Sequence, residues 1–515
     1  MTIEKGPTHL FDRCRVCTIN RLLSLPASAF AMDRSQLPRT AFAFPDARQQ
    51  ALDAWADDAL DRVLTHLSSA AARSPLPDRN ESFGIEEAPI VPEQSVPETA
   101  LLNEAETLLQ GAMNPAHPGF MGHMDPMPAT ASVLGDLLAA AANNNMLSQE
   151  MAPTFTRLER RVTGTLARRF GLGPESGGVM TSGGSLANLH ALAVARNTAF
   201  DDARRAGVGD RSPVLFASEA AHTSIQKAAM LLGLGTDAVL PIPTDAQRRM
   251  DPAALRTHIQ ASQTEGTVPF CVLATAGTTT TGSIDPLDSI ADVADEHGLW
   301  LHVDAAYGGA LTFSDTHRER LHGIERADSI TFNPQKWAYV AKTCAMALFR
   351  DLSAMTDVFH VEAPYMREGT DVQNFGEMSV QGTRHADVLK LWMTLRHLGR
   401  AGLEQLIDES YRLTEYFVER VEERPELELA AEPEMNLICF RGVPEGRDPK
   451  AQDAWNANLQ QHLLRKANVF LSLPRLNGRN WLRAVLLNPF TEPEHVDRLF
   501  EHIDRFVAQS QREAA

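Results

Sequence analysis

The stretches LWLHVDAAY (residues 299–307) and SITFNPQKW (residues 329–337) decide the fold that we expect for this chain. Each begins with a short apolar run and ends in polar residues, which is typical of a strand buried on both faces. Similar runs occur elsewhere, at 178–181, 213–217, 238–242, 270–275 and 345–349. Helical patterns separate these runs, and strands that alternate with helices predict a mostly parallel α/β sheet.

Asp304 and Lys336 follow these two predicted strands. Open parallel sheets bind ligands at the carboxyl ends of their strands, so both side chains are expected in a ligand site. A lysine that bonds covalently to an aldehyde and an aspartate that holds a pyridinium nitrogen are what pyridoxal phosphate (PLP) chemistry requires. The pair therefore indicates a PLP site.

Other predicted strand ends carry polar or glycine-rich turns. The run GGVMTSGGSLAN (177–188) leads through a glycine pair into a helix, whose first N–H groups can bind a phosphate. His222 follows another strand, where its ring can stack on an aromatic cofactor, and Thr278 lies in the run ATAGTTT (274–280). Taken singly, these features are equally explained as a connecting turn, a capping histidine and a polar turn.

These features occur in the order glycine loop, His222, Thr278, Asp304, Lys336. In this order the chain resembles the PLP-dependent group II decarboxylases, which include glutamate, cysteine-sulfinate, aromatic-amino-acid, histidine and diaminobutyrate decarboxylases. The resemblance is strongest over roughly residues 100–400. The motifs that carry it are HVDAAY (302–307), NPQKW (333–337), HPGF (117–120), NNNM (143–146) and AP (152–153).

The resemblance implies fold type I of the PLP-dependent transferases, the aspartate-aminotransferase-like fold. A large α/β domain with a mostly parallel sheet would be joined to a small C-terminal α+β domain. Lys336 would hold PLP covalently, and Asp304 would pair with the pyridine nitrogen and keep it protonated. His222 would stack on one face of the ring, and Ala306 would pack on the other.

Phosphate contacts are implied in the same way. Gly184, Ser185 and Asn333 would bind the phosphate, and Thr278 would lie beside the ring. The family usually has a histidine before the lysine, whereas this chain has Gln335. Glutamine can donate a hydrogen bond to a phosphate but carries no charge, so phosphate affinity or its dependence on pH is expected to differ.

Two further matches concern catalysis and substrate binding. Tyr365 lies 29 residues after Lys336, the position of a family tyrosine on a mobile loop, and would be a proton donor. Arg384, in GTRHADVLKLW (382–392), matches the segment whose arginine would hold the substrate's α-carboxylate. Thr383 stands where the family has a glycine before that arginine.

The run GFMGHM (119–124) bears on the substrate's side chain. Glutamate decarboxylases place an asparagine near the position of Gly122 to hold the distal carboxylate, so its absence weakens a glutamate assignment. Gly122 is also expected to widen the pocket for an aromatic or larger side chain. His123 can instead meet an acidic side chain from another direction, which keeps acidic substrates open.

The expected reaction is decarboxylation of an L-amino acid, a small-molecule substrate, to its amine and CO2. Two alternatives remain open. One is another PLP reaction, either decarboxylation coupled to oxidative deamination or transamination, although Tyr365 argues against the oxidative variant. The other is a catalytically degenerate binding protein, which Lys336, Asp304 and Arg384 argue against.

Composition excludes several other classes. The net charge of −18 argues against a nucleic-acid surface, and no run of about 18 apolar residues suggests a membrane span. The five cysteines do not form a disulfide framework, and the CxxC of Cys14 and Cys17 lacks further zinc ligands nearby, so no metal is expected. A cytoplasmic protein is expected.

We expect four regions along the chain. Residues 1–38 would be a poorly ordered extension, 39–114 a helical segment and linker, 115–390 the PLP-binding domain and 391–515 the small domain. Apolar residues at helical spacing predict an amphipathic helix within 46–73, and a long helical stretch is predicted over 387–423. The apolar stripe of the first helix needs a partner, and with the family resemblance it predicts a homodimer.

Overall fold

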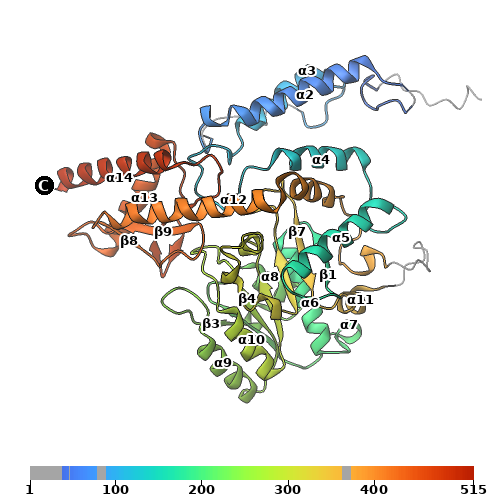
Figure 1. Ribbon diagram of the computed structural model, residues 1–515, viewed down its shortest axis with the longest axis vertical. Helices are drawn as coiled ribbons and strands as arrows, with labels where there is room; N and C mark the ends of the chain where they lie inside the picture. Colours follow the sequence, from blue (N-terminus) through green and yellow to red (C-terminus); the bar gives the residue numbers. More distant parts are fainter. Residues whose placement is uncertain (1–36, 46, 78–88, 362–372, 515) are drawn as a thin grey trace, which may run out of the picture. The chain divides into compact units, whose positions relative to one another are not determined.

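The computed structural model of the chain describes residues 37–45, 47–77, 89–361 and 373–514 (Figure 1). It divides into two units, one made of Met1–Ser68 and Asp78–Ala112 and the other of Ser69–Pro77 and Met113–Ala515. Almost all of the extension expected over residues 1–38 lies outside the described residues.

The first unit is built on two helices, α2 (Gln50–Ser68) and α3 (Glu98–Gln110), which lie side by side in Figure 1. Helix α2 is the amphipathic helix expected within 46–73. Arg62 of α2 donates hydrogen bonds to Asn103 and Glu106 of α3 and thereby joins the two helices. Neither helix contains a buried residue, and apolar side chains stand exposed on both: Leu60, Val63, Leu64, Leu101, Leu108 and Leu109.

A seven-stranded sheet forms the centre of the second unit within the described residues, in the order β1-β7-β6-β5-β4-β2-β3. Its strands are β1 (Gly177–Thr181), β2 (Pro213–Ser218), β3 (Val239–Ile242), β4 (Val268–Thr275), β5 (Trp300–Asp304), β6 (Ser329–Phe332) and β7 (Ala345–Phe349). Each coincides with an apolar run of the sequence. Most of their residues are buried, as expected for strands covered on both faces.

The directions of the strands bring the expected site residues to one edge. Strands β3, β2, β4, β5 and β6 are parallel, and β7 is antiparallel to both β6 and β1. Strand β1 therefore runs in the same direction as β6. The carboxyl ends of all strands except β7 meet at the same edge, which is where this class of sheet binds ligands.

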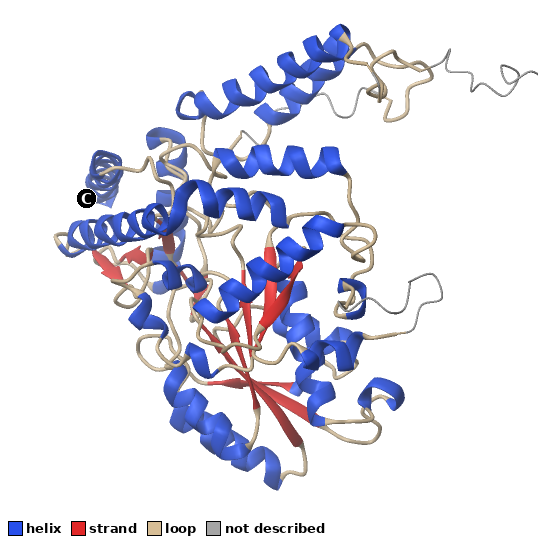
Figure 2. Cartoon of the chain, turned by 45° about the vertical axis from the view of Figure 1, so that its right-hand side comes forward, coloured by secondary structure: helices blue, strands red, loops and turns tan. Residues whose placement is uncertain are grey.

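Helices cover both faces of this sheet (Figure 2). The helices of this unit between Met113 and α12 are α4 (Thr130–Ala142), α5 (Pro153–Arg169), α6 (Gly184–Ala199), α7 (Ala203–Ala206), α8 (Ser224–Leu231), α9 (Pro252–Thr264), α10 (Leu287–His297) and α11 (Ser353–Phe359), of which α4 packs mainly on α12 and α7 and α11 on α6. The alternation of strand and helix along the chain confirms the fold expected from the sequence.

A smaller antiparallel sheet follows in the order β12-β9-β8, within the described part of the chain. Its strands are β8 (Leu427–Leu429), β9 (Leu437–Gly442) and β12 (Leu482–Val485), packed with α13 (Pro449–His462) and α14 (Pro493–Ala514). A short hairpin, β10 (Arg475–Leu476) with β11 (Arg479–Asn480), precedes β12. Phe417, Phe440 and Phe500 meet edge to face or tilted at the centre of this core.

Helix α12 (Val388–Glu422) joins the two cores. It is interrupted at Gly399, whose φ of 66° is open to glycine and strained for other residues. Its apolar residues up to Tyr411 belong to the core of the large sheet, and those from Leu413 onward belong to the small core. The change of core falls inside this helix, later in the chain than the boundary expected after residue 390.

None of the helices in the described residues is both long enough and apolar enough to cross a bilayer.

Candidate active site

A cavity of about 510 Å³ opens at the carboxyl ends of β1, β2, β4, β5 and β6. Eight residues that the sequence singled out lie in its wall: His123, Gly184, Ser185, His222, Asp304, Ala306, Asn333 and Lys336. The tertiary structure therefore brings together in one place residues that are spread over more than two hundred positions of the chain.

Asp304 is the last residue of β5 and is almost completely buried. Its Oδ1 accepts the backbone N–H of Ala306 at 3.1 Å, and its Oδ2 accepts from Asn188 Nδ2 at 2.9 Å. Lys336 follows β6 and lines the same cavity. Burial lowers the pKa of its ammonium, while Asp304 acts in the opposite direction. A lowered pKa increases the fraction of free amine at neutral pH, the form that attacks an aldehyde.

Asn188, on α6, connects Asp304 to a chain of buried side chains. Its Oδ1 lies 3.1 Å from His302 Nε2, and His302 Nδ1 lies 2.9 Å from Ser329 Oγ. Because the Asn188 amide group donates to the carboxylate, its oxygen must accept from His302 Nε2–H. Burial lowers the pKa of His302 to about 4, so this ring is neutral at pH 7. The hydrogen bond to Asn188 places its single proton on Nε2.

The same amide reaches His222 on the other side. Asn188 Nδ2 lies 2.9 Å from Ser224 Oγ, which lies 2.9 Å from His222 Nδ1. Ser224 accepts from the amide and therefore donates to His222, whose Nδ1 also accepts the backbone N–H of Ser224 at 3.2 Å. The proton of a neutral His222 is left on Nε2. Burial lowers the pKa of this ring, which favours that neutral form.

The start of α6 has the features of a phosphate site. Gly184 and Ser185 are its first residues and line the cavity. A Cβ on Gly184 would lie 2.7 Å from Asn333 Nδ2, so this position has no room for a side chain. Among the described residues, buried Asn333 Oδ1 and Thr275 Oγ1 have no hydrogen-bond partner, although both residues line the cavity. Unpartnered polar groups beside a helix N-terminus fit a polar, anionic ligand such as the PLP phosphate.

Gln335 also lies in the cavity wall. Its Oε1 accepts the backbone N–H of Cys344 at 2.6 Å, which fixes the orientation of the amide. Its Nε2 group remains as a neutral donor whose state does not change with pH. The structure thus gives Gln335 a definite position, while its effect on phosphate affinity stays a prediction.

Thr278 does not occupy the expected position. Its hydroxyl accepts the backbone N–H of Ser283 at 3.0 Å and lies 2.9 Å from Thr281 Oγ1, so the side chain closes its own turn. Thr275, Gly277 and Thr279 line the cavity instead. The polar turn expected as the simpler interpretation of this stretch describes Thr278 correctly.

Arg384 also departs from its expected role. Its guanidinium donates to both carboxylate oxygens of Glu159, at 3.0 and 3.2 Å, and to the carbonyl oxygen of Met180 at 2.9 Å. Both side chains are buried, and Arg384 is absent from the cavity wall. Glu159 Oε1 accepts the N–H of Met180 as well, so this pair ties α5, β1 and the start of α12 together. In this structure Arg384 is thus engaged by Glu159 and lies outside the described cavity wall, and its carboxylate-binding role stays a prediction without support from this geometry.

Arg483 is the arginine that lines the cavity. It lies in β12, is 7% exposed, and donates to the carbonyl oxygens of Gly122 and Thr279. Two of its five N–H groups are thereby held by the backbone, which orients the remainder of the guanidinium fork. The sequence patterns did not single out Arg483 as a site residue. An arginine inside an otherwise apolar run was the available signal, because a buried charge needs a specific partner.

The pocket beside Gly122 is not widened. A Cβ on Gly122 would lie 2.2 Å from Cε1 of Phe470, so the ring of Phe470 fills the space. His123 lies against the same ring, with centroids 5.1 Å apart, and its Nδ1 is 3.4 Å from Arg483 Nη2. The expectation of extra room for an aromatic substrate at Gly122 is therefore wrong.

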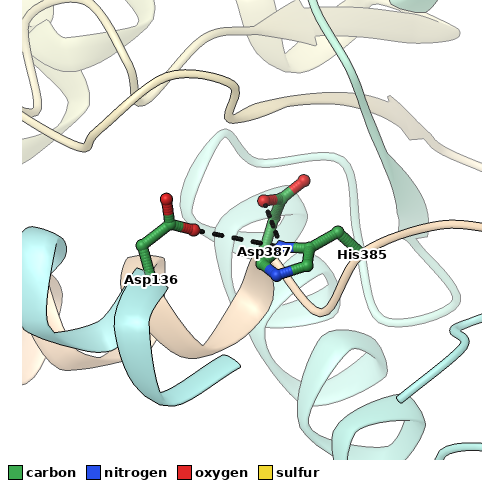
Figure 3. A group of neighbouring side chains, drawn as sticks. All are labelled: Asp136, His385 and Asp387. Atoms are coloured by element: carbon green, nitrogen blue, oxygen red, sulfur yellow. Dashed lines mark hydrogen bonds and ion pairs between the residues drawn. The ribbon is translucent and has the colours of Figure 1, made fainter. Parts of the chain in front are cut away.

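A possible cation cluster lies outside this cavity. Asp136 of α4 and His385 and Asp387, just before α12, turn their polar atoms toward one another (Figure 3). The ammonium of Lys390 lies 3.1 Å from Asp136 Oδ1 and 2.9 Å from Asp387 Oδ1. This ammonium offsets part of the negative charge of the two carboxylates, so a charge network is sufficient to explain the cluster.

Tyr365, the expected proton donor, lies outside the described residues, which resume at 373. Its role stays a prediction.

A parallel-sheet fold with this arrangement of lysine, aspartate and phosphate site defines an enzyme of PLP fold type I. Residues 84–443 match the family model described as the pyridoxal-dependent decarboxylase conserved domain. The chain is 34% identical over 420 residues to cysteine sulfinic acid decarboxylase of Rattus norvegicus, covering 79% of this chain and 85% of the relative. It is 37% identical over 410 residues to L-2,4-diaminobutyrate decarboxylase of Rhizobium meliloti (strain 1021), covering 78% and 81%.

Solved structures agree. The crystal structure of mouse CSAD superposes with a TM-score of 0.85 at 31% identity, covering 89% of this chain and 99% of the other. The crystal structure of Oryza sativa TDC with PLP and tryptamine superposes with a TM-score of 0.85 at 26% identity. The match covers 91% of this chain and 100% of the other. The chain belongs to the pyridoxal-dependent group II decarboxylases, carboxy-lyases that use PLP as their cofactor to remove CO2 from an amino acid.

The two arginines can be separated by mutation. Arg384→Met leaves the buried Glu159 carboxylate unpaired and should lower the free energy of unfolding by about 3–5 kcal/mol. The KM of the remaining folded enzyme should change little. Arg483→Met should lower kcat/KM by about 100-fold or more, because a substrate carboxylate loses its oriented partner. Urea unfolding and initial rates of CO2 release measure both effects, and the reverse pattern would restore the assignment to Arg384.

Proposed function

We propose that this decarboxylase binds its substrate between Lys336 and Arg483. The observation that carries the proposal is the shared cavity wall, which contains the partly buried Lys336, the buried carboxylate of Asp304 and the oriented guanidinium of Arg483. The residues fit PLP: Gly184, Ser185 and Asn333 would hold its phosphate, and Lys336 its aldehyde carbon. Bound PLP supplies an electron sink for the electron pair that departing CO2 leaves behind.

Asp304 would carry the charge that keeps the pyridine nitrogen protonated. Its two oxygens already accept from Asn188 and from the N–H of Ala306, which holds the carboxylate in one orientation. Burial strengthens its interaction with a neighbouring cation because the local dielectric is low. His222, fixed through Ser224, would stack on one face of the ring and Ala306 on the other. Thr278 has no place in this scheme.

Arg483 would take the role first assigned to Arg384. A guanidinium binds a carboxylate through paired N–H donors, and its backbone partners keep it in place. Holding the α-carboxylate at a fixed angle to the cofactor would select which bond to the α-carbon breaks. Tyr365 would then deliver a proton to that carbon, so that the product leaves as an amine.

Two other activities were weighed. Oxidative deamination to an aldehyde, or transamination, requires the proton at the α-carbon to be withheld or misplaced, and Tyr365 argues against the oxidative route. A binding protein without catalysis has no use for a cavity lysine whose pKa is lowered beside a buried carboxylate. Neither alternative has a structural observation in its favour.

We further propose a homodimer in the cytoplasm. The exposed leucines on α2 and α3 form apolar surface that pairing with a second copy would cover. Cys271, Cys344 and Cys439 are free and buried, which agrees with a reducing compartment. Replacing Leu60 and Leu64 with glutamate should shift the mass from dimer toward monomer in sedimentation at micromolar concentration. A wild-type monomer with full activity would contradict the dimer.

Lys336→Ala should abolish CO2 release from every amino acid, because the amine that holds the cofactor is lost. PLP should also be removed by gel filtration, with loss of near-visible absorbance. Exposed Lys450→Ala is the matched control and should retain both properties. Circular dichroism establishes that the variant is folded. Full turnover in Lys336→Ala would refute the proposed site.

Tyr365→Phe should still release CO2 but form less amine. Without the phenol, protonation of the α-carbon is slower. Reaction with oxygen, or protonation at another atom, can then compete with amine formation. Aldehyde and ammonia should rise as amine falls, measured together against CO2 for the best substrate. An unchanged yield and rate of amine would remove Tyr365 as the donor without affecting the role of Lys336.

A further inference from the structure

The cavity wall contains ionisable side chains beyond those that hold the cofactor and the α-carboxylate. With Lys336, Asp304, His222 and Arg483 assigned, the ionisable residues that remain in the described wall are His123 and Asp125. Both lie in the segment that precedes α4, close to Arg483. A substrate side chain that extends beyond the α-carbon therefore meets these two groups.

Asp125 is the charged group of this pair. Its Oδ1 forms an ion pair with the ammonium of Lys342, whose side chain is 47% exposed and does not line the cavity. Within the described residues, Oδ2 of Asp125 has no hydrogen-bond partner. Exposed ion pairs are weak, so the Lys342 ammonium can turn to water at little cost. Because Asp125 lines the cavity, its carboxylate can then accept hydrogen bonds from a ligand there.

His123 supplies no compensating positive charge. Burial lowers the pKa of its ring, and the nearby Arg483 lowers it further. Arg483 has only donors, so the 3.4 Å contact makes Nδ1 of His123 the acceptor and leaves the proton on Nε2. The ring is a neutral donor at neutral pH. It can complement a polar group, but it does not offset the negative charge of Asp125.

Aromatic side chains are disfavoured for a different reason. Phe470 fills the space beside Gly122, and Phe120 packs against Phe470 with centroids 5.5 Å apart. Gly122 therefore provides no extra room for an aromatic ring. An acidic side chain would bring a second carboxylate toward Asp125, a like-charge contact that selects against it.

We propose that Asp125 binds a cationic group at the end of the substrate's side chain, which makes the substrate a diamino acid. The proposal rests on the proposed function, because it assumes that Arg483 holds the α-carboxylate. His123 would donate through Nε2 to a neutral acceptor or to water beside that cation. The relative from Rhizobium meliloti named a diaminobutyrate decarboxylase agrees with this class, whereas the cysteine sulfinic acid decarboxylases represent the opposite one.

The first measurement compares substrates on the PLP-loaded wild-type enzyme. Initial rates of CO2 release are determined for 2,4-diaminobutyrate, ornithine and lysine, for aspartate, glutamate and cysteine sulfinate, and for tyrosine and tryptophan. The proposal expects the highest kcat/KM for a diamino acid. An acidic or aromatic amino acid at the top of the series would overturn it.

The second measurement tests the residue. Asp125→Asn keeps the shape of the side chain and removes its charge, so kcat/KM for the diamino acid should fall by about 10- to 100-fold. The acidic substrates should fall less or improve. Lys342→Met removes the ion-pair partner that competes with the substrate, and it should raise kcat/KM for the diamino acid. A uniform fall for all substrates in Asp125→Asn would assign Asp125 a structural role and overturn the proposal.

The two hypotheses fail in different ways. If no amino acid releases CO2 although PLP is bound, the proposed function fails. Binding of the same amino acids, followed by the change in cofactor absorbance, still compares cationic with acidic ligands. Tighter binding of diamino acids that Asp125→Asn abolishes would support the role of Asp125 even then, and equal binding would overturn it.

Discussion

The buried carboxylate of Asp304 is the charge on which the rest of the site depends. A carboxylate with so little exposure is stable only where donors are fixed around it, and here they are the amide of Asn188 and the N–H of Ala306. Asn188 in turn is held by His302, and the same amide orients His222 through Ser224. One amide on α6 therefore positions both the carboxylate proposed to pair with the pyridine nitrogen and the ring proposed to cover the cofactor.

This network also explains the apparent excess of polar residues in the centre of an apolar sheet. His302 and Ser329 are neighbours on β5 and β6, completely buried, and they form the end of the chain that leads to Asp304. A neutral histidine between two defined partners transmits orientation without adding charge. The low dielectric that makes Asp304 effective toward a cation is thus maintained by neutral hydrogen-bonding groups.

The two arginines illustrate the limit of local sequence patterns. Arg384 and Arg483 are both buried. Buried apolar residues lie next to each of them in the sequence. Arg384 finds a carboxylate partner in Glu159 and becomes a structural tie, whereas Arg483 bonds only to carbonyl oxygens and one histidine and keeps donors for a ligand. The distinction lies in the distant residues that face each guanidinium, which are Glu159 of α5 for Arg384 and the loop residues Gly122 and Thr279 for Arg483. The residues next to each arginine in the sequence do not predict this difference.

Sequence alone determined the strands, the helix α12 and the positions of Lys336, Asp304 and His222 at or just after strand ends, because continuous apolar runs and strand-end polar residues are local patterns. Tertiary structure decided what depends on contacts between distant segments. Phe470 closes the space beside Gly122 from more than three hundred residues away, Thr278 turns into its own loop, and Arg483 reaches the cavity from the small domain's sheet. Packing between distant segments sets the direction of each side chain and the partner of each hydrogen-bond donor. A local sequence pattern does not contain that information.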